Sequence, residues 1–378
     1  EHDHGHRPDS GAPRTGRSLR AAIAAASRMT ARTPALTVAA LPDGAAHYAH
    51  LRQLAEQNGL FDRQPRYYAY KISFNMSLLT LSILFLVLVD SFPLQLLNAL
   101  VLAFVLVQIS FIGHDVGHQQ VFGSTRKNEV LGLIVSFIFG SSRTWWVEKH
   151  NLHHANPNDL DLDPDTDIPM WAFSEGQALS KRGLYKLLSR YQAFLFYVIL
   201  SLEGFGLRLA SVLYMLRHDI KYPRLEPVIL IAHITLYVGS IFYVLGGWDA
   251  VLFIVVNQLA IGLYTGSVFA PNHKGMPLLG RDARLDFLTR QVVTARNIKS
   301  SPLNDFLFGG LNYQIEHHLF PSMPRNRLKE AKKLIEPFCL AHSIPYREES
   351  VLESQKSILR HLHAASAPLR MKAASPAP

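Results

Sequence analysis

The chain has 378 residues, a formal net charge of +9 and a single cysteine, Cys339. One cysteine excludes disulfides, cysteine-ligated zinc and iron–sulfur clusters as organising features, so 18 histidines make nitrogen the abundant metal ligand. The basic residues lie at the two ends and in one central stretch, without a nucleic-acid-binding module. We therefore expect no nucleic-acid partner, and a lipid bilayer instead.

The first 64 residues are expected to be an N-terminal tail. It opens with "EHDHGHRPDS", and a low-complexity Ala/Arg/Ser stretch follows, which predicts disorder at the start. We interpret His2, His4 and His6 as tail residues rather than as part of a site. No signal-peptide pattern is present at the start.

Four apolar stretches reach the length of about 20 helical residues that a bilayer requires. Only "SF" separates the first two before Pro93, and "GW" separates the last two before Asp249, so each pair predicts a tight helical hairpin. The predicted spans are residues 72–90, 93–113, 227–246 and 249–270.

Two further stretches are ambiguous. Residues 130–141 are apolar but short, which favours a buried or re-entrant helix over a span. Residues 191–216 contain Glu203 and Arg208 between basic flanks, which is typical of an amphipathic helix in the membrane interface, with a span as the alternative.

The distribution of Lys and Arg predicts the orientation. The turns at 91–92 and 247–248 contain neither, whereas the N-terminal segment, residues 119–226 and the C-terminal tail hold essentially all of them. The positive-inside rule places those three regions in the cytoplasm. We therefore expect an all-α integral membrane protein, with four spans in two hairpins under a cytoplasmic helical cap that carries a metal site.

Eight histidines fit this topology. Two stand four apart in "GHDVGH" after the second span, and three lie in "HNLHH" at spacings that share a helix face. One follows the fourth span in "FAPNHKGMP", and two are adjacent in "QIEHH". An even number of spans puts all of them on one side. They are His114, His118, His150, His153, His154, His273, His317 and His318.

Eight imidazoles exceed the needs of one metal ion, since zinc takes four ligands. They suit two ions with four imidazoles each, and nitrogen-rich coordination with vacant positions fits iron, although zinc or copper would bind the same ligands. The zincin motif HExxH is absent, which argues against a metalloprotease. A membrane metal transporter would instead carry metal-binding side chains within its spans, where only His233 and Asn257 qualify.

"HDVGH", "HNLHH" and "QIEHH", ordered around two hairpins, resemble the three histidine boxes of the membrane fatty-acid desaturases. The resemblance covers roughly residues 65–345, and residues 346–378 are left as a C-terminal tail. It implies that all eight histidines bind two iron ions, which use O₂ and two electrons to desaturate a fatty acyl chain. The substrate that it implies is the thioester of that acyl chain with coenzyme A. His273 would match the extra histidine of acyl-CoA desaturases. A lipid or carotenoid hydroxylase of the same superfamily is the alternative.

Gln314 stands where many desaturases have another histidine, and resembles the front-end type, which works between an existing double bond and the carboxyl end. We expect Gln314 to orient its neighbours, or to ligate weakly through its carbonyl oxygen. The "HPGG" motif of a cytochrome b5 domain is absent. The resemblance therefore implies an external electron donor, a ferredoxin or cytochrome b5 with a reductase. Some related bacterial enzymes act at mid-chain, so the double-bond position stays open.

The acidic run "DLDLDPDTD" lacks the glycine and the terminal glutamate of an EF-hand calcium loop. We expect carboxylates there and inside the boxes to accept hydrogen bonds from ligand imidazoles and so fix their tautomers. Two tryptophans before the second box either line an acyl tunnel or pack in the ordinary way. The expected acceptors are Asp115, Asp159, Asp163 and Glu316, and the tunnel candidates are Trp145 and Trp146.

Overall fold

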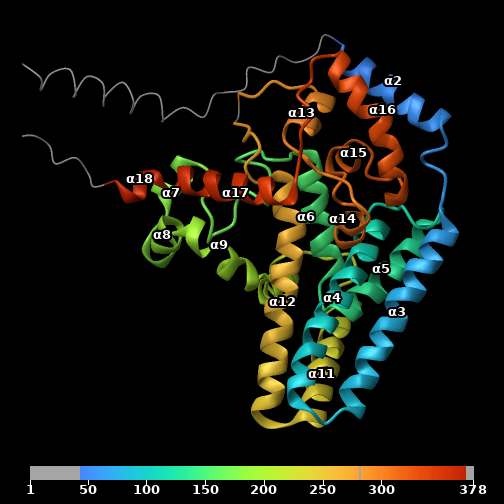
Figure 1. Ribbon diagram of the computed structural model, residues 1–378, viewed down its shortest axis with the longest axis vertical. Helices are drawn as coiled ribbons and strands as arrows, with labels where there is room; N and C mark the ends of the chain where they lie inside the picture. The colour runs from blue at the N-terminus through green and yellow to red at the C-terminus, as the bar shows by residue number, and fades with distance from the viewer. Residues whose placement is uncertain (1–42, 281, 372–378) are drawn as a thin grey trace, which may run out of the picture. The chain divides into compact units, whose positions relative to one another are not determined.

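The structure, a computed structural model, describes residues 43–280 and 282–371, so His2, His4 and His6 lie outside the described residues. The prediction of a mostly helical protein is confirmed (Figure 1). Within the described residues, four helices are long and apolar enough to cross a membrane, or up to six if each of two bent pairs is one span. The four are α3 (Pro65–Leu88), α4 (Phe92–Gly117), α11 (Leu225–Leu245) and α12 (Gly247–His273).

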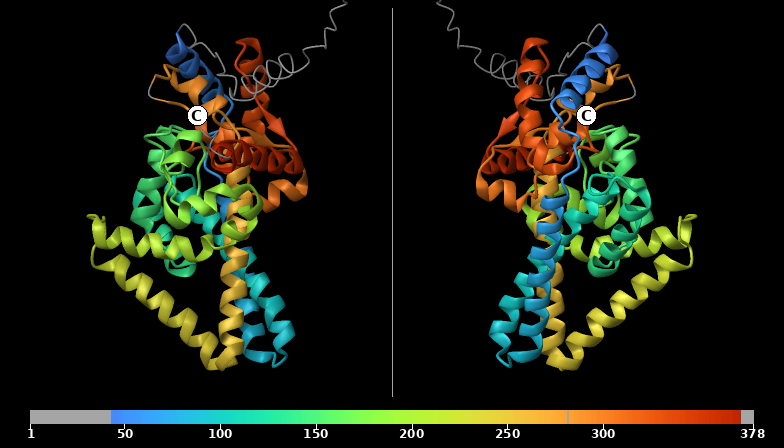
Figure 2. Two further views of the ribbon diagram at one scale, coloured as in Figure 1. Left: turned by 90° about the vertical axis from the view of Figure 1, so that its left-hand side faces the viewer. Right: turned by 90° about the vertical axis from the view of Figure 1, so that its right-hand side faces the viewer.

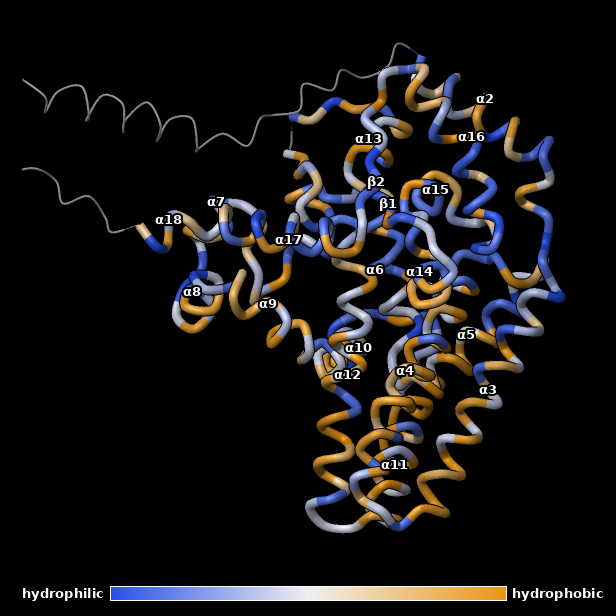
Figure 3. Tube along the Cα trace, in the orientation of Figure 1, coloured by the Kyte–Doolittle hydropathy of each residue, from blue (hydrophilic) through white to orange (hydrophobic). Residues whose placement is uncertain are grey.

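These four helices form two consecutive hairpins whose turns lie at the same end (Figures 1 and 2). Pro93 lies in the first turn of α4, where its missing N–H costs no helical hydrogen bond. Gly246, between α11 and α12, and Gly247, the first residue of α12, have φ values of 67° and 39°, which favour glycine. Hydrophobic residues dominate this end of the helices (Figure 3).

Two of the long helices continue past the apolar stretches that predicted them. Helix α4 runs to Gly117 and α12 to His273, whereas hydropathy predicted ends at 113 and 270. Hydropathy detects only the apolar part of a helix, but the helical hydrogen bonds continue to Lys274, whose N–H donates to the Ala270 carbonyl at 2.9 Å. The added turns carry His114 and His273.

Each of the two ambiguous stretches belongs to a bent helix pair. Helices α5 (Thr125–Phe139) and α6 (Arg143–Ala155) meet at 107°, and Gly140 at the bend has a φ of 80°. Helices α9 (Gln192–Ser201) and α10 (Glu203–Arg217) meet at 69°. The prediction of one continuous amphipathic helix over 191–216 is therefore wrong, because the chain turns at Leu202.

A buried carboxylate fixes the start of α6. Ser142 caps this helix by accepting a hydrogen bond from the Trp145 N–H at 3.2 Å. Glu226, at the start of α11, accepts hydrogen bonds from Ser142 Oγ at 2.5 Å and from the Thr144 N–H at 3.2 Å. The helix that carries "HNLHH" is thus anchored to the third long helix.

The remaining elements surround the upper ends of these helices in Figure 1. Residues 346–371, which the sequence separates as a tail, are folded: Ile358 and Leu362 pack in a core with Trp171 and Phe196. A short parallel pairing joins Asn297 to Glu348. The elements are α2 (Gly44–Gln57), α7 (Glu175–Ser180), α8 (Gly183–Arg190), α13 (Phe287–Val293), β1 (Asn297–Ile298), α14 (Pro302–Leu307), α15 (Gln314–Leu319), η1 (Arg325–Arg327), α16 (Leu328–Ala341), β2 (Glu348–Glu349), α17 (Val351–Ala365) and α18 (Ala367–Arg370).

Candidate metal centre and substrate cavity

The eight histidines predicted from the sequence converge from α4, α6, α12 and α15. They form two groups, and within each group the candidate ligand atoms lie within 4.8 Å of one another. The division is five and three rather than the expected four and four. The rings of His154 and His318 stack at 4.2 Å between centroids where the groups meet. The groups are His114, His118, His150, His154 and His317, and His153, His273 and His318.

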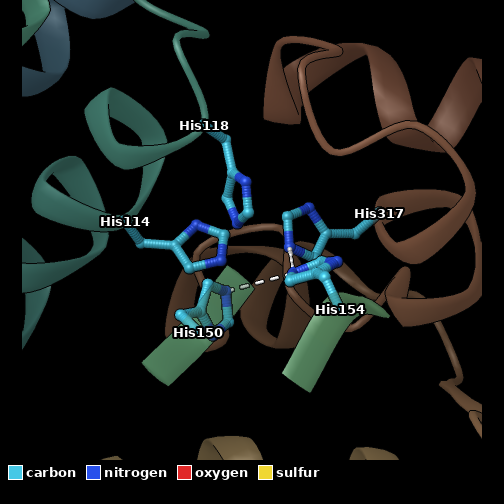
Figure 4. A group of neighbouring side chains, drawn as sticks. All are labelled: His114, His118, His150, His154 and His317. Carbon is cyan, nitrogen blue, oxygen red and sulfur yellow. Dashed lines mark hydrogen bonds between the residues drawn. The ribbon is translucent and has the colours of Figure 1, made fainter. Parts of the chain in front are cut away.

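The group of five points inward from three helices (Figure 4). His154 Nε2 lies 3.1 Å from both His150 Nε2 and His317 Nε2. The Nε2 atoms of His114 and His118 are buried and have no hydrogen-bond partner among the described residues. A metal–imidazole bond of about 2.1 Å places two nitrogens on one ion roughly 3 Å apart, so these spacings fit a shared ion.

In the group of three, hydrogen bonds fix the tautomer of every ring. His153 Nδ1–H donates to the Asp163 carboxylate at 3.0 Å, and His273 Nδ1–H donates to the Thr294 carbonyl at 3.1 Å. His318 Nδ1–H donates to Gln291 Oε1 at 2.8 Å. A neutral imidazole carries one proton, so all three Nε2 atoms present lone pairs.

These lone pairs face one another inside the protein. His153 Nε2 lies 3.3 Å from His273 Nε2, and His318 Nε2 is buried without a hydrogen-bond partner among the described residues. Two facing acceptors repel each other unless a cation lies between them. The residues therefore fit a metal ion held by Nε2 atoms, with the Nδ1 partners orienting the rings.

Burial keeps the imidazoles in their metal-binding form. It lowers the pKa of His118 to about 3, and it holds the pKa values of His317 and His318 well below the ordinary value. These rings are therefore neutral at pH 7, and their unprotonated nitrogens are available as ligands.

Only one of the predicted carboxylates makes a short hydrogen bond to a ligand imidazole. Asp163 binds His153 and is itself fixed by the Asn158 and Asp165 N–H groups, each at 2.8 Å. Asp115 lies 3.5 Å from His114 Nδ1, but its closer partner is Arg325 at 2.9 Å.

Two predicted acceptors bind other groups instead. Glu316 accepts hydrogen bonds from Tyr346 Oη at 2.6 Å and from Asn297 Nδ2 at 2.7 Å. Asp159 accepts from the Asp161 N–H at 3.0 Å. The expectation that these two orient imidazoles therefore differs from the structure, because Glu316 fixes α15 to the rest of the fold and Asp159 closes its own loop.

The orientation of the Gln314 amide follows from its neighbours. Asn272 Nδ2 donates to the Leu311 carbonyl at 3.1 Å and to Gln314 Oε1 at 3.0 Å. The Gln314 NH₂ group therefore faces His273 Nε2, 3.0 Å away. Because Asn272 occupies the carbonyl oxygen, Gln314 borders the group of three without offering that oxygen as a ligand.

Sequence reasoning missed Gln291, Thr294 and Asn272. Gln291 links two imidazoles, since its Oε1 accepts from His318 while its Nε2 donates to the His154 carbonyl at 2.9 Å. These residues carry no motif and lie up to 137 positions from their partners, so no local pattern in the sequence indicates them.

A cavity of about 250 Å³ borders both histidine groups. His114, His150, His153 and His273 lie on its wall, together with Gln314. Both tunnel candidates, Trp145 and Trp146, line it, as do hydrophobic residues of α5, α9, α10 and α12. The arrangement joins metal-binding nitrogens to a largely apolar space of the kind that accepts an elongated hydrophobic ligand.

The sequence profile of the fatty acid desaturase family matches residues 91–350. The chain belongs to the fatty acid desaturase family. It is 31% identical over 328 residues to the acyl-lipid (9-3)-desaturase of Physcomitrium patens, covering 83% of this chain and 62% of that protein. It is 29% identical over 349 residues to the Delta(6)-fatty-acid desaturase of Caenorhabditis elegans, covering 86% and 76%. With the Delta(8)-fatty-acid desaturase of Euglena gracilis the identity is 30% over 337 residues, covering 86% and 80%.

The desaturase resemblance predicted from the three boxes is thereby confirmed. Metal content can distinguish the role of His273 as a ligand from that of Gln314, which only borders the site. We expect His273→Ala to lower the metal content per chain clearly, whereas Gln314→Ala retains nearly normal metal, because Asn272 holds the Gln314 carbonyl away. A residue that only orients a ligand typically changes metal affinity or activity about 10- to 100-fold. Elemental analysis of purified protein measures this, and the reverse ranking would contradict the assignment.

A second prediction concerns the glycine inside the first box. A Cβ at Gly117 would lie 2.4 Å from Trp146 Cζ3, and the Trp146 ring stacks on His150 at 4.6 Å. Ala in place of Gly usually stabilises a helix by about 1 kcal/mol, but here it must displace Trp146 and, with it, His150. We expect Gly117→Ala to lower both metal content and activity.

The matched control is Gly123→Ala, since a Cβ at Gly123 meets no atom within 4 Å. It should keep metal content and activity near those of the unmodified chain. Normal metal content in Gly117→Ala would show that the Trp146 contact does not position His150.

Proposed function

We propose that the chain is an O₂-dependent fatty acyl desaturase whose eight histidines hold two iron ions. The observation that carries this proposal is the pair of facing lone pairs on His153 and His273, 3.3 Å apart, beside an apolar cavity. Nitrogen ligands with vacant positions suit iron. Bound iron would supply the oxidising power by which the acyl chain loses two hydrogen atoms, which O₂ takes with two electrons and two protons to give two water molecules.

The protein's own task is to hold the acyl chain and to keep the ligands oriented. Each methylene removed from water contributes about 0.8 kcal/mol, so ten of them contribute roughly 8 kcal/mol without any polar contact. In this proposal Trp145 and Trp146 form part of the tunnel wall, and Asp163, Thr294 and Gln291 keep the Nε2 atoms unprotonated. Exclusion of water protects the reaction from side products.

The substrate that we propose is an acyl thioester of coenzyme A, desaturated between an existing double bond and the carboxyl end. Gln314 supports the position, as do relatives whose names specify Delta(5), Delta(6) and Delta(8) positions. One relative is named an acyl-lipid desaturase, so an acyl chain esterified to a lipid should be tested as a substrate beside the coenzyme A thioester.

We further propose that the histidines face the cytoplasm and that electrons come from a ferredoxin or cytochrome b5 with a reductase. Support for the first proposal is the absence of Lys and Arg from residues 91–92 and 247–248, at the opposite end of the long helices from the histidines.

The test is the fatty-acid profile of a host that expresses the chain. We expect a new alkene, and we expect its loss on replacing any one of the box histidines by Ala while the protein still inserts in the membrane. The matched control is His218→Ala, because His218 is exposed and belongs to neither histidine group. The replaced residues are His114, His118, His150, His154, His317 and His318.

An alcohol in place of the alkene would indicate the hydroxylase alternative. Substantial activity that survives in two or more of these variants would contradict the metal assignment.

A further inference from the structure

Charged side chains gather on one part of the cavity wall. Lys149 lies in the middle of α6, Lys274 directly follows α12, and Asp165 lies in the acidic run between α6 and α7. Lys149 and Asp165 keep 35% and 30% of their side-chain surfaces accessible, and all three residues line the cavity. Most of the remaining wall consists of aliphatic, aromatic and small residues. Lys149, Lys274 and Asp165 therefore form a charged patch on a largely apolar wall.

The two lysines are bound to the same residue. The Lys149 ammonium forms an ion pair with the Asp165 carboxylate, and Lys274 Nζ donates to the Asp165 carbonyl at 2.8 Å. Lys274 Nζ also lies 4.1 Å from the centroid of the Phe173 ring. An ammonium has three N–H donors. Each lysine uses one of them on a protein acceptor among residues 43–280 and 282–371, which leaves donors for a ligand.

One aspartate does not require two ammonium groups. A cation beside apolar surface is costly unless it is paired and hydrogen-bonded, and the Lys149–Asp165 pair already meets this condition. Arg143, another cation on the wall, is balanced separately, since it forms two hydrogen bonds with Glu129 at 3.1 and 3.4 Å. Glu203 adds a carboxyl to the wall but makes no hydrogen bond or ion pair with either lysine. Lys274 forms no ion pair among the described residues, although the Asp163 and Asp165 carboxylates attract it, so N–H donors of its ammonium group remain for a ligand.

The charged patch of Lys149, Lys274 and Asp165 lies beside the group of three histidines. Asp165 Oδ2 is 3.5 Å from His153 Nδ1, and Lys274 is the residue after His273. The Asp165 carboxylate and the His153 ring thus lie between the Lys149 ammonium and His153 Nε2, a candidate metal ligand. A ligand atom held by these lysines is therefore only a short way from the metal site.

We propose that Lys149 and Lys274 bind the carbonyl end of the acyl substrate and so set the position of the double bond. This inference rests on the proposed function, and it gives that function a substrate-positioning site. The acyl carbonyl is common to a thioester and to a lipid ester. Anchored beside His153, it brings the carbons near the carboxyl end to the metal site, while the apolar wall receives the rest of the chain.

Equilibrium binding to the purified full chain, without an electron donor, tests the proposal. The probes are oleoyl-CoA, a phosphatidylcholine that carries an oleoyl chain, and 9-octadecene, which has no carbonyl. We expect Lys149→Met and Lys274→Met each to weaken binding of both carbonyl probes about ten-fold and to leave 9-octadecene unchanged. Lys149→Arg and Lys274→Arg should restore most of the binding.

The matched control is Lys332→Met. Lys332 is partly buried and paired with Glu348 at 2.5 Å, but it does not line the cavity. It should bind all three probes like the unmodified chain. In turnover with electron donor, the two Met variants should also give products at more than one double-bond position, at unchanged metal content.

Three outcomes would overturn the inference. Unchanged binding of the carbonyl probes, or an equal loss for 9-octadecene, would mean that the lysines only fix the acidic loop. A loss confined to oleoyl-CoA would mean that they bind its phosphates. If the unmodified chain shows carbonyl-dependent binding but forms no alkene, the proposed function fails while the positioning site stands.

Discussion

The constraint on which the site depends is the burial of unprotonated imidazole nitrogens that face one another. His153 Nε2 and His273 Nε2 lie 3.3 Å apart, with both Nδ1 protons committed to oxygen acceptors. Neutral nitrogens that face each other in this way repel each other. A metal ion held between them would replace the repulsion by two bonds, so these residues fit a bound cation.

Holding that arrangement requires segments far apart in the sequence to meet. Asn158 performs much of this task, because its side-chain Nδ2 lies 3.1 Å from each of the carbonyls of His273, Pro277 and Thr294. Arg325, which is 3% exposed, reaches back to Asp115 in the first box at 2.9 Å. Asn158 thus joins the segment after α6 to the end of α12, and Arg325 joins η1 to α4, without adding a ligand.

The sequence was sufficient for the features that depend on local pattern. Apolar runs of spanning length predicted the four long helices, and spacings of four residues predicted that His114 lies with His118 and His150 with His154. His153 was expected on the same face but belongs to the other group. The lysines at 149 and 274 were not predicted, because each is an ordinary charged residue until the fold places both on one cavity wall. Glu316 was assigned the wrong partner for the same reason, since Tyr346 reaches it from 30 residues away. The fold of residues 346–371 also escaped prediction: α17 begins with a capping box of Ser350 and Glu353, which our sequence analysis did not use, and it packs against α9.

Metal content and spectroscopy of the purified full chain test whether each histidine group holds its own iron ion. We expect two iron ions per chain, one for each histidine group, with Mössbauer parameters of nitrogen-ligated iron in two different environments. Replacement of His153, whose Nε2 faces His273, should remove the iron of the group of three and leave that of the group of five. A single iron per chain, or two that are lost together from any single-histidine variant while the protein stays folded, would contradict the division into two groups.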